Sequence, residues 1–277
     1  MRLGAPLFKP YASPSEWVAV VQSQGYRAAY CPVNVDAGDD VIRAYAQAAQ
    51  DADIVIAEVG VWNNPLSSDP VQREAAIAKC KKSLLLADKI GARCCVNLAG
   101  SRGPIWHGPH PLDLTDETFE MIVTSVQDII DAVQPARTAY TLEAMQWLYP
   151  DSPDSYLRLI KAIDRKTCAV HLDPVNMVNS PERFFHNGAL IQDCFAKLGP
   201  YIRSCHAKDV AMSDSALVHL DEVRIGLGKL DYATFLFELS KLDPDTPLML
   251  EHLPTAEDYD LAAAHVWAVA AQEGLAL

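Results

Sequence analysis

Eight short apolar segments alternate with eight longer amphipathic segments along the chain, and this alternation most constrains its fold. Residues 54–61 (Ile-Val-Ile-Ala-Glu-Val-Gly-Val) are typical of the apolar segments. A run of this length is too short for a helix and fits a strand that is covered on both faces. The predicted strands lie near residues 2–8, 26–33, 54–61, 93–100, 137–145, 168–175, 202–209 and 247–253.

Helical patterns fill the intervals between these strands. Ser13-Pro14-Ser15-Glu16 predicts a helix start, with a capping serine followed by an early proline. Other helices are predicted at 39–51, 72–90, 115–133, 152–163, 190–198, 232–242 and 257–272.

No linker or low-complexity tract interrupts the alternation, which predicts one domain over residues 1–277 with a parallel sheet. Eight repeats favour a (β/α)8 TIM barrel, and 277 residues are close to the roughly 250 of that fold. A doubly wound open sheet is the structural alternative. No GxGxxG follows the first strand, which counts against a dinucleotide-binding version of it.

Charge and cysteine usage narrow the functional classes. The formal net charge of −13 repels phosphate backbones and anionic membranes, so we expect neither nucleic acid nor a membrane as a partner. The seven cysteines form no CxxC pair and predict reduced, buried thiols. Residues 1–6 form no apolar leader and no apolar run approaches about 20 residues, so we expect a cytoplasmic protein.

Four polar side chains lie near the carboxyl ends of the last four predicted strands, where apolar residues would be the default. They are Glu143, Asp173, His206 and Glu251. Their spacings of 30, 33 and 45 residues correspond to one strand–helix unit each, so a barrel would bring them to one rim. Buried carboxylates repel one another unless a cation neutralises them. The series predicts a divalent metal site, with Mn²⁺ preferred and Mg²⁺, Co²⁺ or Zn²⁺ as alternatives. The competing interpretation is four unrelated strand-end polar groups.

With these residues the chain resembles the xylose-isomerase-like TIM barrel superfamily of sugar phosphate isomerases and epimerases. Two further motifs carry the resemblance, His206-x-Lys208-Asp209 and Gly226-x-Gly228-x-Leu230-Asp231-Tyr232. It implies a metal that holds two oxygens of a ketose. It also implies that Glu143 and Glu251 move protons at adjacent carbons through a cis-enediolate. Family enzymes are commonly dimers or tetramers, which implies a homo-oligomer.

The surroundings of the metal site depart from the best-known ketose 3-epimerases. Tyr149, Asn176 and Met212 stand where those enzymes carry a glutamate, a histidine and an arginine. The resemblance therefore implies a small carbohydrate substrate without identifying the sugar.

Several other side chains are candidates for binding a substrate. Alternation places His171 in phase with Asp173 and Lys208 in phase with His206. Trp62 could form an apolar wall for a sugar ring, and His107 lies in a long loop, 100–113, that could form the rim. The set of predicted substrate-binding residues is His171, Lys208, Trp62, Asn97, Asn176 and His107. For each, a role in core packing, a salt bridge or an exposed surface is the competing interpretation. His252 is out of phase with Glu251, which favours helix packing.

Three other functions are compatible with such a barrel. The same metal and bases could serve a lyase or dehydratase acting on a keto-inositol or a 3-keto-glycoside. An abasic-site endonuclease would need more histidine ligands and a basic face, which this chain lacks. A non-catalytic sugar-binding barrel is the third alternative.

Overall fold

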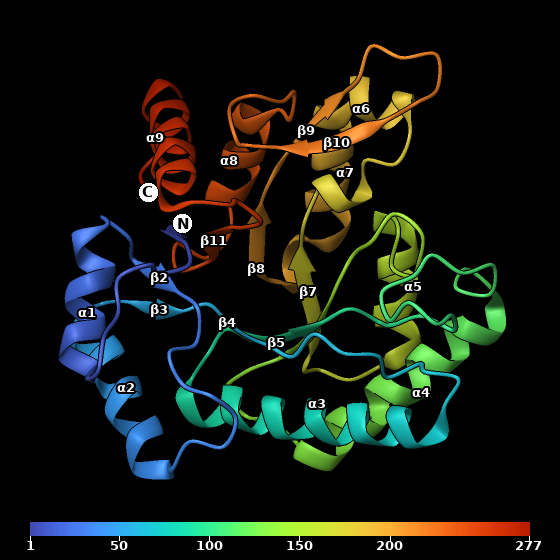
Figure 1. Cartoon of the computed structure of the whole chain (residues 1–277), viewed down its shortest axis with the longest axis horizontal. Coiled ribbons are helices and arrows are strands. Elements are labelled where there is room, and N and C mark those ends of the chain that lie inside the picture. Colours follow the sequence, from blue (N-terminus) through green and yellow to red (C-terminus); the bar gives the residue numbers. More distant parts are fainter.

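The central sheet of the computed structural model, which describes residues 1–277, is parallel throughout and has the strand order β3-β2-β1-β11-β8-β7-β6-β5-β4. Figure 1 shows the helices arranged around these strands as an outer layer. The strands are β1 (Arg2–Gly4), β2 (Ala28–Ala29), β3 (Val55–Ile56), β4 (Glu58–Gly60), β5 (Cys94–Asn97), β6 (Tyr140–Glu143), β7 (Cys168–Leu172), β8 (Ile202–Ala207) and β11 (Pro247–Leu250).

The sheet closes on itself through residues 55–60, because β3 and β4 are consecutive halves of one strand. Ala57 lies between the two halves. Its N–H donates to Ala29 O at 2.8 Å, and its carbonyl accepts from Cys94 N at 3.3 Å. Counted in this way, the nine segments form the eight strands of a (β/α)8 barrel. The fold predicted from the sequence is confirmed.

The outer helices follow the predicted pattern closely. Ser13 accepts from Glu16 N at the start of α1, and Pro14 is the first helical residue. Along α2, the buried residues Ile42, Tyr45 and Ala49 recur at helical spacing and face the strands. The helices are α1 (Pro14–Ser23), α2 (Asp39–Asp51), α3 (Pro70–Ile90), α4 (Asp116–Val133), α5 (Pro153–Ile163), α6 (Pro181–Phe185), α7 (Asn187–Leu198), α8 (Tyr232–Ser240) and α9 (Ala256–Gln272), with 3₁₀ turns at Val175–Met177 and Gly199–Tyr201.

The long segment after β8 contains an antiparallel hairpin, β9 (Asp209–Met212) with β10 (Leu220–Val223). The hairpin projects from the rim of the barrel in Figure 1. Its base is fixed by Asp209, whose carboxylate accepts hydrogen bonds from the backbone N–H groups of Val210, Gly226, Gly228 and Leu230. A Cβ at Gly228 would lie 2.1 Å from Asp209 Oδ1, so this close approach requires glycine.

All seven cysteines are free, and six of them are buried. None of the helices combines the length and the hydropathy needed to traverse a lipid bilayer.

Candidate metal centre

Four neighbouring strands bring the predicted metal ligands together. Glu143 ends β6, Asp173 follows β7, His206 lies in β8 and Glu251 follows β11. These strands are consecutive in the sheet, and the register pairs Met249 with His206. One ligand atom from each of the four residues lies within 4.8 Å of the others. The four side chains therefore form a group that could hold one metal ion.

The carboxylate oxygens at the centre of this group are left without hydrogen bonds. Asp173 Oδ2 and Glu251 Oε2 are buried, and no donor meets the geometry of a hydrogen bond to either. Buried polar atoms without partners are uncommon and call for an explanation. Three carboxylates and one imidazole are a suitable donor set for a divalent cation.

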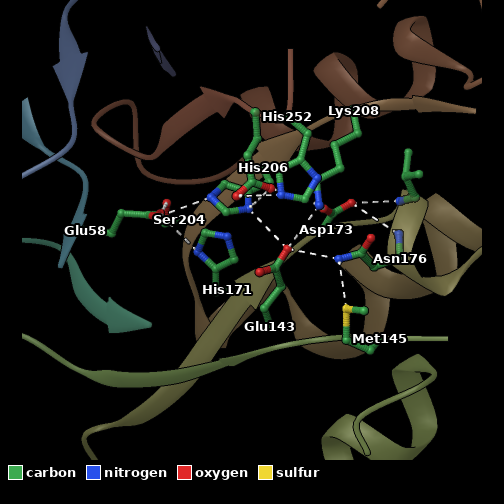
Figure 2. A network of polar contacts seen from close by, with 12 residues as sticks. Glu58, Glu143, Met145, His171, Asp173, Asn176, Ser204, His206, Lys208 and His252 are labelled. Carbon is green, nitrogen blue, oxygen red and sulfur yellow. Dashed lines mark hydrogen bonds and ion pairs between the residues drawn. The ribbon is translucent and has the colours of Figure 1, made fainter. Parts of the chain in front are cut away.

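Lys208 supplies a positive charge to the same carboxylates, and Figure 2 shows its side chain beside Asp173. Its Nζ lies 2.9 Å from both Asp173 Oδ2 and Glu251 Oε2 and 3.5 Å from Glu143 Oε1. These contacts have the distance of an ion pair, although the angles at Asp173 Oδ2 and Glu251 Oε2 are not those of hydrogen bonds. Lys208 is 3% exposed, so the ammonium group is almost entirely enclosed by acidic neighbours.

His206 is held on its far side by a fourth carboxylate, that of Glu58 on β4. Glu58 Oε1 lies 3.2 Å from His206 Nε2, and Glu58 Oε2 accepts from Ser204 Oγ at 3.2 Å. His206 Nδ1 faces the other way, 2.9 Å from Glu251 Oε2 and 3.2 Å from Glu143 Oε1. A carboxylate that fixes the second nitrogen of a metal-binding imidazole is the usual arrangement around such ligands. This role of Glu58 is not among the roles predicted from the sequence.

The two glutamates expected to carry protons have different environments. Burial raises the pKa of Glu143, although Lys208 and His206 act in the opposite direction. Burial acts on Glu251 as well, but His206 and Lys208 outweigh it and hold the pKa of Glu251 well below its usual range. Carboxyl groups whose pKa values are shifted apart are suited to serve as an acid and a base in one site.

A cavity of about 390 Å³ opens above the group. Both Glu143 and Glu251 line it. The other lining residues are Trp62, Leu98, Trp106, His107, Met145, Asn176, Lys208, Glu222 and His252. Asn176 Nδ2 donates to Glu143 Oε1 at 3.0 Å and so fixes the orientation of that carboxylate. Four predicted substrate-binding residues, Trp62, His107, Asn176 and Lys208, therefore meet at the cavity.

His171 and Asn97 do not line this cavity. His171 is fully buried, with its ring centroid 4.0 Å from that of His206, and Nδ1 lies 3.4 Å from Glu58 Oε2. Asn97 is also fully buried, and its amide exchanges hydrogen bonds with Asn63. Asn97 thus fixes the residue after Trp62, and its expected contact with a substrate hydroxyl is not what the structure shows.

His252 differs from its expected role in helix packing. Its side chain is 55% exposed, lines the cavity, and lies 3.1 Å from Glu222 Oε2 on β10. The contact joins the hairpin to the rim of the barrel. His252 has φ of +60° and Trp62 has φ of +32°, a left-handed region that non-glycine residues rarely adopt. Strained backbone of this kind often occurs at functional sites.

Comparison with known proteins identifies the family and the fold. A family model described as "Xylose isomerase-like TIM barrel" matches residues 18–268. The chain belongs to the xylose isomerase-like TIM barrel family. The family recognised from the strand-end residues is thereby confirmed. No curated protein matches the chain by sequence.

Solved structures similar to this xylose isomerase-like barrel cover almost its whole length. One is a xylose isomerase-like TIM barrel protein from Mycobacterium smegmatis in complex with magnesium, with 17% identity, a TM-score of 0.67, and coverage of 95% of this chain and 90% of that one. Another is the probable 3-DHS dehydratase AsbF from Bacillus anthracis, with 16% identity, a TM-score of 0.70, and coverage of 96% and 97%. A third is a D-psicose 3-epimerase from Clostridium cellulolyticum H10, with 15% identity, a TM-score of 0.69, and full coverage of both chains. At these identities the likeness establishes the fold.

Proposed function

We propose that this protein is a divalent-metal-dependent isomerase or epimerase of a sugar or a sugar-like ketose. The observation that carries the proposal is that Glu143 and Glu251 belong to the group that could hold the cation and also line the cavity above it. A substrate in that cavity would contact both carboxylates. The named similarity to an epimerase supports this choice of reaction, and the similarity to a magnesium complex supports the cation.

In this proposal Glu143, Asp173, His206 and Glu251 hold the cation, with Mn²⁺ as the first choice and Mg²⁺, Co²⁺ or Zn²⁺ as alternatives. A bound divalent cation would supply positive charge beside a substrate carbonyl and make the adjacent C–H more acidic. Glu58 keeps the imidazole of His206 oriented, and Asn176 keeps Glu143 in place.

The chain's own residues then carry the proton. One glutamate removes a proton from the carbon next to the carbonyl, and the other returns a proton at the same or the adjacent carbon through an enediolate. Which acid acts first depends on the face of the sugar that each meets. Trp62 offers an aromatic wall for the C–H face of the sugar, and Lys208 offers a positive charge to developing oxyanions.

A dehydratase or lyase acting on a keto-inositol or 3-keto-glycoside is the second candidate. One observation favours it: the Lys208 ammonium lies 2.9 Å from Glu251, so a third proton-bearing group is present beside the two acids. Such a group could protonate a departing hydroxyl or alkoxide. The named similarity to a probable dehydratase agrees with this candidate.

The test is turnover in deuterated water. Purified protein, stripped of metal and then supplied with Mn²⁺, would be incubated with ketoses, inososes and 3-keto-glycosides. Deuterium at the carbon next to the carbonyl, with no loss of water or aglycone, supports isomerisation or epimerisation. Loss of water or aglycone selects the second candidate.

Variants complete the test. Glu251→Gln and Glu143→Gln should reduce turnover by roughly 10²-fold or more, the range for loss of a general acid or base. Glu120→Gln, on the exposed face of α4, is the matched control and should match wild type. Turnover that needs no metal, or that survives Glu251→Gln, contradicts the proposal. Sugar binding without turnover would indicate the non-catalytic alternative, and cleavage of abasic DNA the endonuclease.

The expected homodimer or homotetramer, the cytoplasmic location and the absence of nucleic-acid and membrane partners stay predictions.

A further inference from the structure

A second cavity, of about 580 Å³, lies at the end of the barrel opposite the metal centre. Its lining residues come from five neighbouring positions in the sheet, each just before or at the start of β5, β6, β7, β8 or β11. The metal ligands lie at the carboxyl ends of the same strands, so the two sites occupy opposite faces. Arg93 precedes β5, Arg137 and Thr138 precede β6, Lys166 precedes β7, Arg203 lies in β8, and Thr246 precedes β11.

This cavity is positively charged in a chain whose formal net charge is −13. Four cationic side chains line it, from Arg93, Arg137, Lys166 and Arg203, against one carboxylate, that of Asp243. Asp243 Oδ2 accepts from Arg93 Nη2 at 2.9 Å. Burial lowers the pKa of Arg203, and the charge of Arg93 acts in the same direction, whereas Asp243 opposes both.

Three buried polar atoms that belong to the lining have no hydrogen-bond partner. They are Arg93 Nε, Thr138 Oγ1 and Thr246 Oγ1. Thr138 is 6% exposed and Thr246 is 1% exposed, so neither hydroxyl is an ordinary surface group. Each of the three atoms can donate a hydrogen bond. Unpaired donors and clustered cations in one cavity are complementary to a ligand that carries negative charge and several acceptor oxygens.

We propose that this cavity binds a small tetrahedral oxyanion of the phosphate class. Phosphate supplies negative charge and several acceptor oxygens to a lining that carries the Arg93 and Arg203 guanidinium groups and the hydroxyls of Thr138 and Thr246. The source of the phosphate can be the free ion or the phosphate group of a small metabolite. The site is independent of the metal centre and of the reaction proposed there.

The test is calorimetric titration of the full-length, chelator-treated protein with inorganic phosphate, at constant ionic strength set with chloride. The chelator removes any metal ion from the opposite face of the barrel, so that phosphate cannot bind to a metal there. We expect saturable binding of phosphate and none of chloride. Arg203→Met should weaken binding by roughly tenfold or more, as expected for loss of one charge-assisted hydrogen bond or ion pair. Arg158→Met is the matched control, because Arg158 is exposed and lies outside the cavity lining; it should bind phosphate like wild type.

A second variant keeps the test valid if Arg203→Met unfolds. Thr138→Val combined with Thr246→Val removes two unpaired hydroxyls at nearly constant volume. Because those hydroxyls have no partner, we expect unchanged or higher resistance to urea without phosphate, and weaker phosphate binding. Titration with glucose 6-phosphate and with inorganic phosphate distinguishes a phosphorylated metabolite from the free ion. Tighter binding of the ester than of the free ion indicates a metabolite. The proposal would be overturned if wild type does not bind phosphate, or if wild type and the double variant bind it equally. Ordered water would then be the partner of the two hydroxyls.

Discussion

Glu58 Oε1 lies 3.2 Å from His206 Nε2, and this contact leaves His206 Nδ1 facing Glu143 and Glu251. Two strands on opposite sides of the barrel, β4 and β8, meet through it. The orientation of the imidazole is therefore set before any cation binds. The two histidines in turn stabilise the buried carboxylate of Glu58. Burial opposes its ionisation, but His206 and His171 hold the pKa of Glu58 below its usual value.

Glu58→Gln should weaken Mn²⁺ binding by about 10- to 100-fold, as found when the outer partner of a metal-binding histidine is removed. The reason is that glutamine cannot supply the negative charge that makes His206 a better donor. Titration of Mn²⁺ followed by electron paramagnetic resonance measures the dissociation constant. Ser204→Ala, which removes only the hydrogen bond from Ser204 to Glu58, should change the constant less. Equal Mn²⁺ affinity in wild type and Glu58→Gln would show that this contact does not act on the metal site.

Lys208→Met should destabilise the metal-free protein by about 3–5 kcal/mol, the cost of leaving buried charges with one partner removed. Three carboxylates lie within 3.5 Å of its ammonium group. Urea unfolding measures the loss, and saturating Mn²⁺ should reduce it because the cation neutralises the same carboxylates. The control is Lys241→Met, which breaks an exposed ion pair with Glu238 and should cost no more than about 1 kcal/mol. A Lys208→Met protein as stable as wild type without metal would refute this account.

Asp209→Ala should lower the free energy of unfolding by at least about 3 kcal/mol, because four backbone N–H groups lose their acceptor. The turn at Gly226–Gly228 should open, and the base of the β9–β10 hairpin with it. Urea unfolding and proteolysis of residues 209–231 measure the two effects. Asp214→Ala, at the exposed tip of the same hairpin, should stay within about 0.5 kcal/mol of wild type. Similar protease resistance in both variants would argue against Asp209 as the anchor.

Thiol labelling should distinguish Cys31 from the other six cysteines. Cys31 is partly exposed, and burial raises its pKa to about 11. The thiolate is the reactive form, and its fraction rises about tenfold per pH unit below the pKa, so labelling should accelerate about tenfold from pH 8 to pH 9. Burial raises the pKa of Cys168 and Cys194 to about 12, and both are enclosed. Mass spectrometry after iodoacetamide treatment should find one alkylated cysteine in the folded protein; several would contradict the packing of the barrel.

The clustering of the four candidate metal ligands could be predicted because strands that follow one another along the chain lie side by side in a barrel. One strand–helix unit separates Glu143 from Asp173 and Asp173 from His206, and the same edge of the sheet receives each residue. The predicted strands are longer than the observed ones. Within 26–33, for example, only Ala28–Ala29 form paired strand.

The predictions for Asn97 and His252 depended on which face of the sheet each side chain occupies. Register pairs Glu58 with Cys94 and Gly60 with Val96, so Asn97 points away from the barrel interior toward Asn63 and Cys80. The sequence does not contain that register. Alternation predicts that His252 packs toward the helices, but β11 ends at Leu250 and the left-handed backbone at His252 breaks the alternation. The sequence does not predict the hairpin, since β10 (Leu-Asp-Glu-Val) carries little apolar signal.

The closure of the barrel at Ala57 affects how the protein can associate with other copies of itself. The two hydrogen bonds of Ala57, to β2 on one side and β5 on the other, leave the central sheet without a free edge to recruit a strand from another molecule. The β9–β10 hairpin has no such protection, and Leu217 and Val218 at its tip are 75% and 59% exposed. Intermolecular β-pairing should therefore begin at residues 209–223, and a lysine introduced there should oppose it.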